Sequence, residues 1–166
     1  MQSQNSTHKL ALRGLLIAVC FILSWLESKL PVFTTPGMKL GITNITILIA
    51  LYKLGNKDAF AINTVRIILV GFTFGNIFSL LYSLSGGLLS CLIMILLKST
   101  TKFKIVTISM VGGLSHNIGQ IIMAMIILQT NGVIYYLPIL WFGGIMSGIL
   151  VGLIGGLTLT RIRINV

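Results

Sequence analysis

The chain has 166 residues, of which 55% are hydrophobic and only 8% are charged, and its mean hydropathy is +1.03. Soluble domains carry roughly 25% charged residues, so this composition excludes a soluble globular protein and indicates an integral membrane protein. The net charge of +10 comes from 12 basic and two acidic residues that are scattered along the chain, which gives no support to nucleic-acid binding.

The apolar residues occur in long runs separated by short polar segments. This pattern favours membrane helices over barrel strands, because barrel strands alternate polar and apolar residues over about ten positions. We therefore expect a single all-α domain, an integral membrane bundle of six transmembrane helices. The expected spans cover residues 10–30, 42–54, 59–82, 86–98, 105–128 and 133–160. The second is short for a full span, so the loop before it enters the membrane or the helix is tilted.

The first span follows a polar, basic start, which is also the pattern of a signal peptide. Residues 17–20 resemble a lipobox, but Val19 is a poor residue before a lipidated cysteine and no hydrophilic domain follows. We therefore expect a retained helix. Gly14 and Ala18 on this helix are four residues apart, a spacing that lets another helix approach closely. This face either packs inside the bundle or docks to a separate subunit.

The long polar segment of the first half is residues 27–44. It contains Glu27, which is one of the two acids, together with Lys39 and two of the three prolines, and it ends at Asn44. A polar segment of this length between two apolar runs indicates that something polar is bound there. Glu27 at the outer end of the first span is either a ligand contact or an ordinary interfacial residue.

The third expected span carries a cation. Arg66 lies about eight residues into the span, which is roughly 12 Å along a helix. It either snorkels to the cytoplasmic interface or belongs to a functional site, because ionisable groups inside a membrane are costly and usually functional. Asn63 and Asn76 add polar groups at other depths, which favours a functional site. We expect a turn at residues 83–87 after this span.

The fifth expected span holds a polar cluster at residues 115–120, which read Ser-His-Asn-Ile-Gly-Gln. His116 and Gln120 are four residues apart and share a helix face, and Asn117 adds an amide. The cluster either lines a binding pocket or makes hydrogen bonds that only hold the helices together. The sixth span has glycines at every fourth position, which predicts close helix packing along one face: Gly144, Gly148, Gly152 and Gly156.

The basic residues also predict the orientation. With the amino terminus in the cytoplasm, nine of the 12 basic residues fall in cytoplasmic segments, as the positive-inside rule requires. We therefore expect a multi-pass protein of the cell membrane with both termini cytoplasmic. The nine residues are Lys9, Arg13, Lys53, Lys57, Lys98, Lys102, Lys104, Arg161 and Arg163.

No catalytic or metal-binding motif is present. Two acids cannot build a two-metal carboxylate site or the aspartate-rich motif of a prenyl-chain synthase, and no Walker or dinucleotide motif occurs. Cys20 and Cys91 lie inside apolar runs, which suits buried thiols rather than a disulfide. We expect no cofactor, no metal and no ATP hydrolysis by this chain, and the residues suit binding better than catalysis.

Several motifs, taken in order, resemble the Gx transporter family, which is also labelled heptaprenyl diphosphate synthase component I. They are residues 26–28, the Pro-Gly-Met-Lys-Leu-Gly-Ile-Thr-Asn run at 36–44, Arg66, residues 83–87 and residues 115–120. That family is similar to the S components of energy-coupling-factor (ECF) transporters. The resemblance implies a six-helix bundle that holds a small molecule under a loop, with a separate membrane coupling subunit and two ATPases. It would give Gly14 and Ala18 a role in docking to that subunit.

Two functional hypotheses follow. The first is a substrate-binding membrane subunit for uptake of a small, anionic or polar-headed molecule, such as a vitamin or an isoprenoid-like precursor, under a loop at residues 34–38. The second, which the synthase label implies, is a membrane accessory that holds a prenyl tail for a heptaprenyl diphosphate synthase in quinone side-chain synthesis. Membrane lipid surrounds the chain in both cases. The predicted substrate-binding residues are Glu27, Lys39, Asn44, Arg66, Asn76, His116, Asn117 and Gln120.

Overall fold

The computed structural model describes residues 2–29 and 41–162, and over these residues the fold is all-α, as expected. In chain order the elements are α1 (Gln2–Lys29), α2 (Thr43–Lys53), α3 (Asn56–Phe74), α4 (Ile77–Ser99), α5 (Ile105–Leu128), the 3-10 helix η1 (Asn131–Tyr136) and α6 (Leu137–Arg161).

Four segments of the described chain are long and apolar enough to cross a membrane: Thr7–Glu27, Ile77–Ser99, Ile105–Leu128 and Asn131–Arg161. This identifies a membrane protein, although six helices do not amount to six clear spans. Helix α3 has 19 residues but includes Lys57, Asp58 and Arg66. Helix α2 has 11 residues, or about 16 Å, which is roughly half of the hydrocarbon core of a bilayer.

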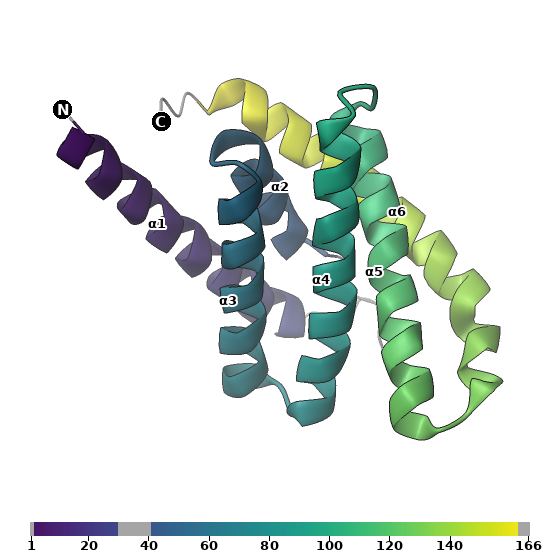
Figure 1. Ribbon diagram of the computed structural model, residues 1–166. Helices are drawn as coiled ribbons and strands as arrows, with labels where there is room; N and C mark the ends of the chain where they lie inside the picture. The colour runs from purple at the N-terminus through teal and green to yellow at the C-terminus, as the bar shows by residue number, and fades with distance from the viewer. Residues whose placement is uncertain (1, 30–40, 163–166) are drawn as a thin grey trace.

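The helices form a bundle in which α1 lies obliquely (Figure 1). Helix α1 packs on α2 and α3. Helix α3 contacts α4, α4 contacts α5 and α5 contacts α6, and α6 in turn contacts α2. The beginning of α1, the end of α6 and the α2–α3 and α4–α5 turns lie at one end of the bundle, with the α3–α4 and α5–α6 turns at the other. Helix α2 lies behind α3 and α4 in this view and occupies only part of the bundle's length.

Helix α2 is the centre of the hydrophobic core. Its residues 47–51 are all buried, and the buried core cluster around them includes Cys20 of α1, Ile62 of α3 and Met94 of α4. A helix that is apolar on every side is expected to be enclosed by other helices. The short length of α2 is therefore compatible with a membrane because protein, not lipid, surrounds it.

Both ends of α2 contact a charged side chain from another helix. At its beginning, Glu27 of α1 accepts hydrogen bonds from the Gly41 N–H at 2.5 Å and from Thr43 Oγ1 at 3.2 Å. At its end, Lys98 of α4 donates to the Leu51 carbonyl at 2.5 Å. An anion beside the start of a helix and a cation at its end both interact favourably with the helix dipole, and Lys98 also satisfies a carbonyl of the last turn that the helix leaves free. Charges from α1 and α4 thus stabilise a helix that ends inside the bundle.

The expected boundary between the third and fourth spans is wrong. The sequence predicted helices at 59–82 and 86–98, whereas α3 ends at Phe74 and α4 begins at Ile77. The break lies at Gly75 and Asn76, where the Asn76 side chain accepts a hydrogen bond from the Ser79 N–H at 2.8 Å and so caps α4. Asn76 is therefore a capping residue.

The glycines at the expected turn lie inside α4. A Cβ added to Gly86 would lie 2.7 Å from the His116 carbonyl oxygen, and one added to Gly119 would lie 2.7 Å from the Ser85 carbonyl oxygen. These residues are glycines because the backbones of α4 and α5 approach closely there. Sequence alone did not separate this use of glycine from a turn, because both occur within an apolar run.

The glycine series of α6 packs as predicted over most of its length. Gly144, Gly148 and Gly152 each face α5, where an added Cβ would lie within 3 Å of an α5 atom. Gly156, in contrast, faces open space, and its neighbour Gly155 packs on Leu48 of α2. The sixth helix also begins later than expected, because η1 covers residues 131–136.

Candidate functional site

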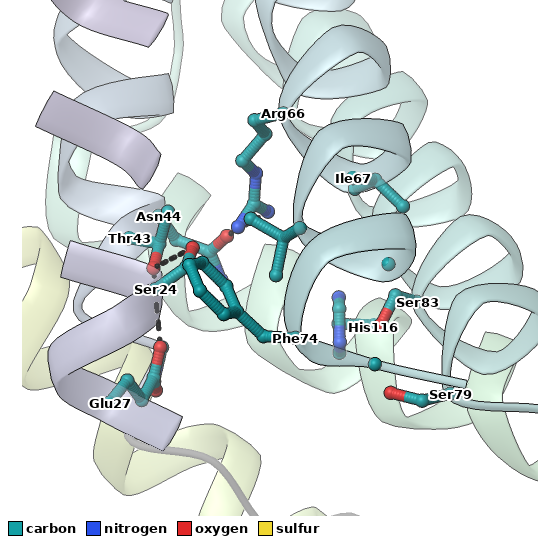
Figure 2. Close-up of a pocket in the computed structure, with 14 residues that line it drawn as sticks. Ser24, Glu27, Thr43, Asn44, Arg66, Ile67, Phe74, Ser79, Ser83 and His116 are labelled. Carbon is teal, nitrogen blue, oxygen red and sulfur yellow. Dashed lines mark hydrogen bonds between the residues drawn. The ribbon is translucent and has the colours of Figure 1, made fainter. Parts of the chain in front are cut away.

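A cavity of about 120 Å³ lies among α1, α2, α3, α4 and α5 (Figure 2). Both polar and apolar groups contribute to its wall, so a bound molecule would meet hydrogen-bonding atoms on one side and carbon on another. The lining residues are Ser24, Glu27, Gly41, Thr43, Asn44, Arg66, Ile67, Val70, Gly71, Phe74, Gly75, Ser79, Ser83 and His116.

The guanidinium of Arg66 is fixed by two asparagines. Its Nε and Nη2 donate to Asn63 Oδ1 at 3.1 and 3.0 Å, and Nη2 also donates to Asn44 Oδ1 at 3.0 Å. Asn63 is only 2% exposed, and its own Nδ2 donates to the Gly87 carbonyl oxygen at 2.9 Å. These bonds join α2, α3 and α4, and they hold the Arg66 head inside the bundle rather than at the end of the helix.

The positive charge of Arg66 is not matched by an ion pair within residues 2–29 and 41–162. The two acids of the chain are both engaged elsewhere, because Asp58 pairs with Arg13 Nη2 at 2.8 Å and Glu27 binds the beginning of α2. Glu27 lines the same cavity, but the Arg66 hydrogen bonds go to neutral amide oxygens. A buried cation whose hydrogen-bond partners are neutral amides is costly, so the Arg66 guanidinium is a candidate contact for an anionic or strongly accepting group.

Hydroxyl and imidazole groups lie on the side of the cavity away from Glu27 and Asn44 (Figure 2). Ser79 and Ser83 are four residues apart on α4, and His116 comes from α5 (Figure 2). The carbon side of the wall is formed by Ile67, Val70 and Phe74. The arrangement suits a small molecule that has an accepting head and an apolar body.

The predicted binding residues separate into two groups. Glu27, Asn44, Arg66 and His116, which are far apart in sequence, all line the cavity, whereas Asn76, Asn117 and Gln120 do not. Lys39 and the expected loop at residues 34–38 lie outside the described residues.

Asn117 and Gln120, the two α5 amides that do not line the cavity, lie at contacts between helices. Asn117 donates a hydrogen bond to the Leu140 carbonyl oxygen and so joins α5 to α6. Gln120 packs with its Cγ near Gly86, and its buried Oε1 has no hydrogen-bond partner in the described part of the chain. Since the α5 helix turns by about 100° per residue, the neighbours of His116 point toward different helices.

The family model for heptaprenyl diphosphate synthase component I matches residues 16–158. The chain belongs to this family. The match confirms the resemblance to the Gx transporters that the motifs indicated, and it includes every described residue of the cavity. Searches of curated proteins and of solved structures each found no match. Membership in the component I family fits both functional hypotheses, so the site has to distinguish them.

Some site residues of this component I family member were missed from the sequence. The sequence indicated Asn63 as a polar group of this span, but it was not among the predicted binding residues, although it lies three residues before Arg66 and therefore on the same face of α3. Ser79 and Ser83 were hidden by the incorrect helix boundary, since a turn at 83–87 would have separated them. Ser24 and Thr43, whose hydroxyl oxygens lie 3.2 Å apart, gave no distinctive pattern.

The small residues of α1 do not pack inside the described bundle. Gly14 and Ala18 are both exposed, and a Cβ added to Gly14 would have no other atom within 4 Å. The described residues leave this face open, which does not support packing within the bundle, and docking to another helix stays a prediction. The two cysteines, Cys20 and Cys91, are buried free thiols, as the sequence indicated.

Proposed function

We propose that the chain is the substrate-binding membrane subunit of an uptake transporter for a small molecule with an anionic or strongly accepting head. One observation carries the proposal: Arg66 is held at the wall of a cavity by two asparagines and has no ion-pair partner among the described residues. The anion that balances this charge would be the head of the transported molecule.

The head of the ligand would also meet the beginning of α2. Thr43 and Asn44 occupy the first turn of that helix, and both line the cavity. Helix beginnings attract anions because their N–H groups are unsatisfied and the helix dipole is positive there. His116 and Ser83 on the opposite wall are suited to hydrogen-bond the same head or a second polar group.

The size of the cavity limits the body of the ligand. Its volume is about 120 Å³, whereas one buried water needs only about 10–15 Å³ on the same measure. A small vitamin or an isoprenoid precursor of a few carbons, lying beside Ile67 and Phe74, would suit such a cavity. A heptaprenyl tail is far larger, so the cavity favours the transporter over the tail-holding accessory.

Transport would require partners. The exposed face of Gly14 and Ala18 is suited to a coupling subunit in the membrane, which would work with two ATPases. All six helices would lie in the membrane of the cell as a multi-pass bundle. The positive-inside rule would place the end with the α2–α3 and α4–α5 turns in the cytoplasm, since Lys57 and Lys102 lie at those turns.

A binding assay tests the proposal. The purified full-length chain in lipid nanodiscs is titrated with candidate vitamins, short carboxylates and isoprenoid phosphates, with tryptophan fluorescence as the signal, because Trp25 lies on α1 two residues before Glu27. Saturable binding that Arg66→Ala weakens at least tenfold, or about 1.4 kcal/mol, is expected. Arg161→Ala, which removes an exposed cation at the end of α6, is the matched control and is expected to bind normally.

The second candidate function is the accessory role that the family name describes, and the name is its support. Purification of the tagged chain from membranes separates the two. Recovery of ATPase subunits supports the transporter. Recovery of a soluble prenyl synthase, together with no saturable binding of any small anion to a folded chain, would refute the transporter proposal.

A further inference from the structure

A second cavity, which we call the inner cavity, is smaller than the first. Its volume is about 10 Å³, and it lies among α2, α4, α5 and α6. Asn44 lines both cavities, so the Arg66 cavity and the inner cavity adjoin at this residue. The lining residues are Asn44, Ser90, Met94, Ser109, Gly112, Gly113, Ser147, Gly148 and Val151.

Two of the serines that line the inner cavity have hydroxyl groups without a hydrogen-bond partner in the described part of the chain. Ser90 of α4 and Ser109 of α5 are each 4% exposed, and neither hydroxyl is hydrogen-bonded to any group within residues 2–29 and 41–162. Ser147 of α6, in contrast, donates to the Gly144 carbonyl oxygen at 3.3 Å. Buried polar groups are almost always hydrogen-bonded to protein or to ordered water, so the two serines require a partner.

Glycines bring the three serine-bearing helices together at this point. A Cβ on Gly112 would lie 3.3 Å from Ser90 Oγ and 2.7 Å from Met94 Cγ, and one on Gly148 would lie 2.8 Å from the Ser109 carbonyl oxygen. Any side chain at these positions would enter the cavity or separate the helices. The cavity is thus a consequence of close packing at glycines, and not a gap left by a mismatch of large side chains.

We propose that the inner cavity is a binding site for one ordered water molecule, held by the hydroxyl groups of Ser90 and Ser109. The volume of about 10 Å³ is close to the smallest that admits a water. Hydroxyls from α4, α5 and α6 and the amide of Asn44 surround it, which supplies the two to four polar partners that a buried water uses. This site is separate from the proposed substrate site and does not depend on transport.

A metal cation does not suit the same cavity. No carboxylate is among its lining residues, and Asn44 Oδ1 already accepts a hydrogen bond from the positively charged Arg66. Sodium would therefore meet neutral hydroxyls next to a like charge, whereas water can both donate and accept. The water would lie behind the Asn44 amide and support the wall of the Arg66 cavity from the inner side.

A high-resolution crystal structure of the full-length chain in a lipid phase tests the proposal. We expect one density peak within hydrogen-bond distance of both Ser90 Oγ and Ser109 Oγ. The double variant Ser90→Ala and Ser109→Ala is expected to lose that peak, because only Ser147 and Asn44 would remain as polar partners. The control Ser99→Ala removes an exposed α4 hydroxyl and is expected to retain it.

The wild-type chain alone suffices if the double variant does not fold. An empty cavity, at a resolution that reveals other buried waters, would overturn the proposal. So would a peak with the short coordination distances of a cation that disappears when sodium is replaced by choline. Retention of the peak in a folded double variant would show that these two hydroxyls do not hold it, and the assignment would fail.

Discussion

Removing the charge of Glu27 should destabilise the whole bundle, because this side chain holds the beginning of the central helix. Its two carboxylate oxygens accept from the Gly41 N–H at 2.5 Å and from Thr43 Oγ1 at 3.2 Å. Hydrogen bonds to charged groups contribute about 1.5–3 kcal/mol each, and an anion near a helix start adds about 0.3–1 kcal/mol. The second bond is long, so we expect Glu27→Ala to lower the free energy of unfolding by about 3 kcal/mol.

Glu27→Gln removes the negative charge of this side chain but keeps its size and shape. The amide oxygen of glutamine can replace one acceptor but not both, so a loss of about 1–2 kcal/mol is expected. Asp58→Asn is the matched control, because it removes the other acid, whose pairing with Arg13 is partly exposed and should contribute about 0–1 kcal/mol. The assay is reversible chemical unfolding in mixed detergent micelles, followed by circular dichroism.

The double variant of Glu27→Gln with Thr43→Val measures the contact itself. If the Glu27 carboxylate binds Thr43 directly, the two losses should be less than additive by roughly 0.5–1 kcal/mol. Glu27→Gln as stable as wild type, or Asp58→Asn more harmful, would refute the assignment of Glu27 as the cap of α2. A change in ligand affinity with no change in stability would instead make Glu27 a ligand contact.

Three further substitutions test the packing and the site. Gly86→Ala should lower stability by about 1–3 kcal/mol in the same unfolding assay, because the new Cβ would lie 2.7 Å from an α5 backbone oxygen. Gly156→Ala, which faces open space, should be neutral or stabilising; equal losses at both positions would contradict this packing. Lys98→Met should cost about 1–2 kcal/mol by leaving the end of α2 without its donor, and the exposed Lys102→Met should cost nothing measurable. Asn63→Ala should weaken ligand binding several-fold in the fluorescence titration, by releasing the Arg66 head; unchanged affinity would show that Asn63 does not position it.

The sequence predicted the class of fold and four members of the cavity wall, for reasons that are visible in the structure. Composition is enough to identify apolar helices, because in a bilayer each helix must satisfy its own backbone. Arg66 and His116 were found because a polar residue is conspicuous in an apolar run. Their convergence with Glu27 and Asn44 is a property of the packing of α1, α2, α3 and α5, which spacing along one helix cannot reveal.

The failures have a common cause. Gly86 was predicted to lie in a turn and Asn76 inside a helix, although the chain turns at Asn76 and runs straight through Gly86. In an apolar segment, glycine at a turn and glycine at a helix contact have the same neighbours in sequence. Only the partner helix distinguishes them, and its approach at His116 lies 30 residues further along the chain.

The short length of α2 accounts for both the site and its charges. A full-length span would place its first N–H groups at the membrane surface, where water satisfies them, whereas α2 begins within the bundle beside Arg66. Two positive features, a guanidinium and a helix beginning, then meet in one cavity, and Glu27 is the acid that the described structure places there. Because Glu27 is hydrogen-bonded to Gly41 and Thr43 rather than to Arg66, the proposed function assigns the Arg66 guanidinium to the ligand. We therefore expect that extending α2 at its beginning would fill the cavity and abolish the proposed binding, even with every lining side chain intact.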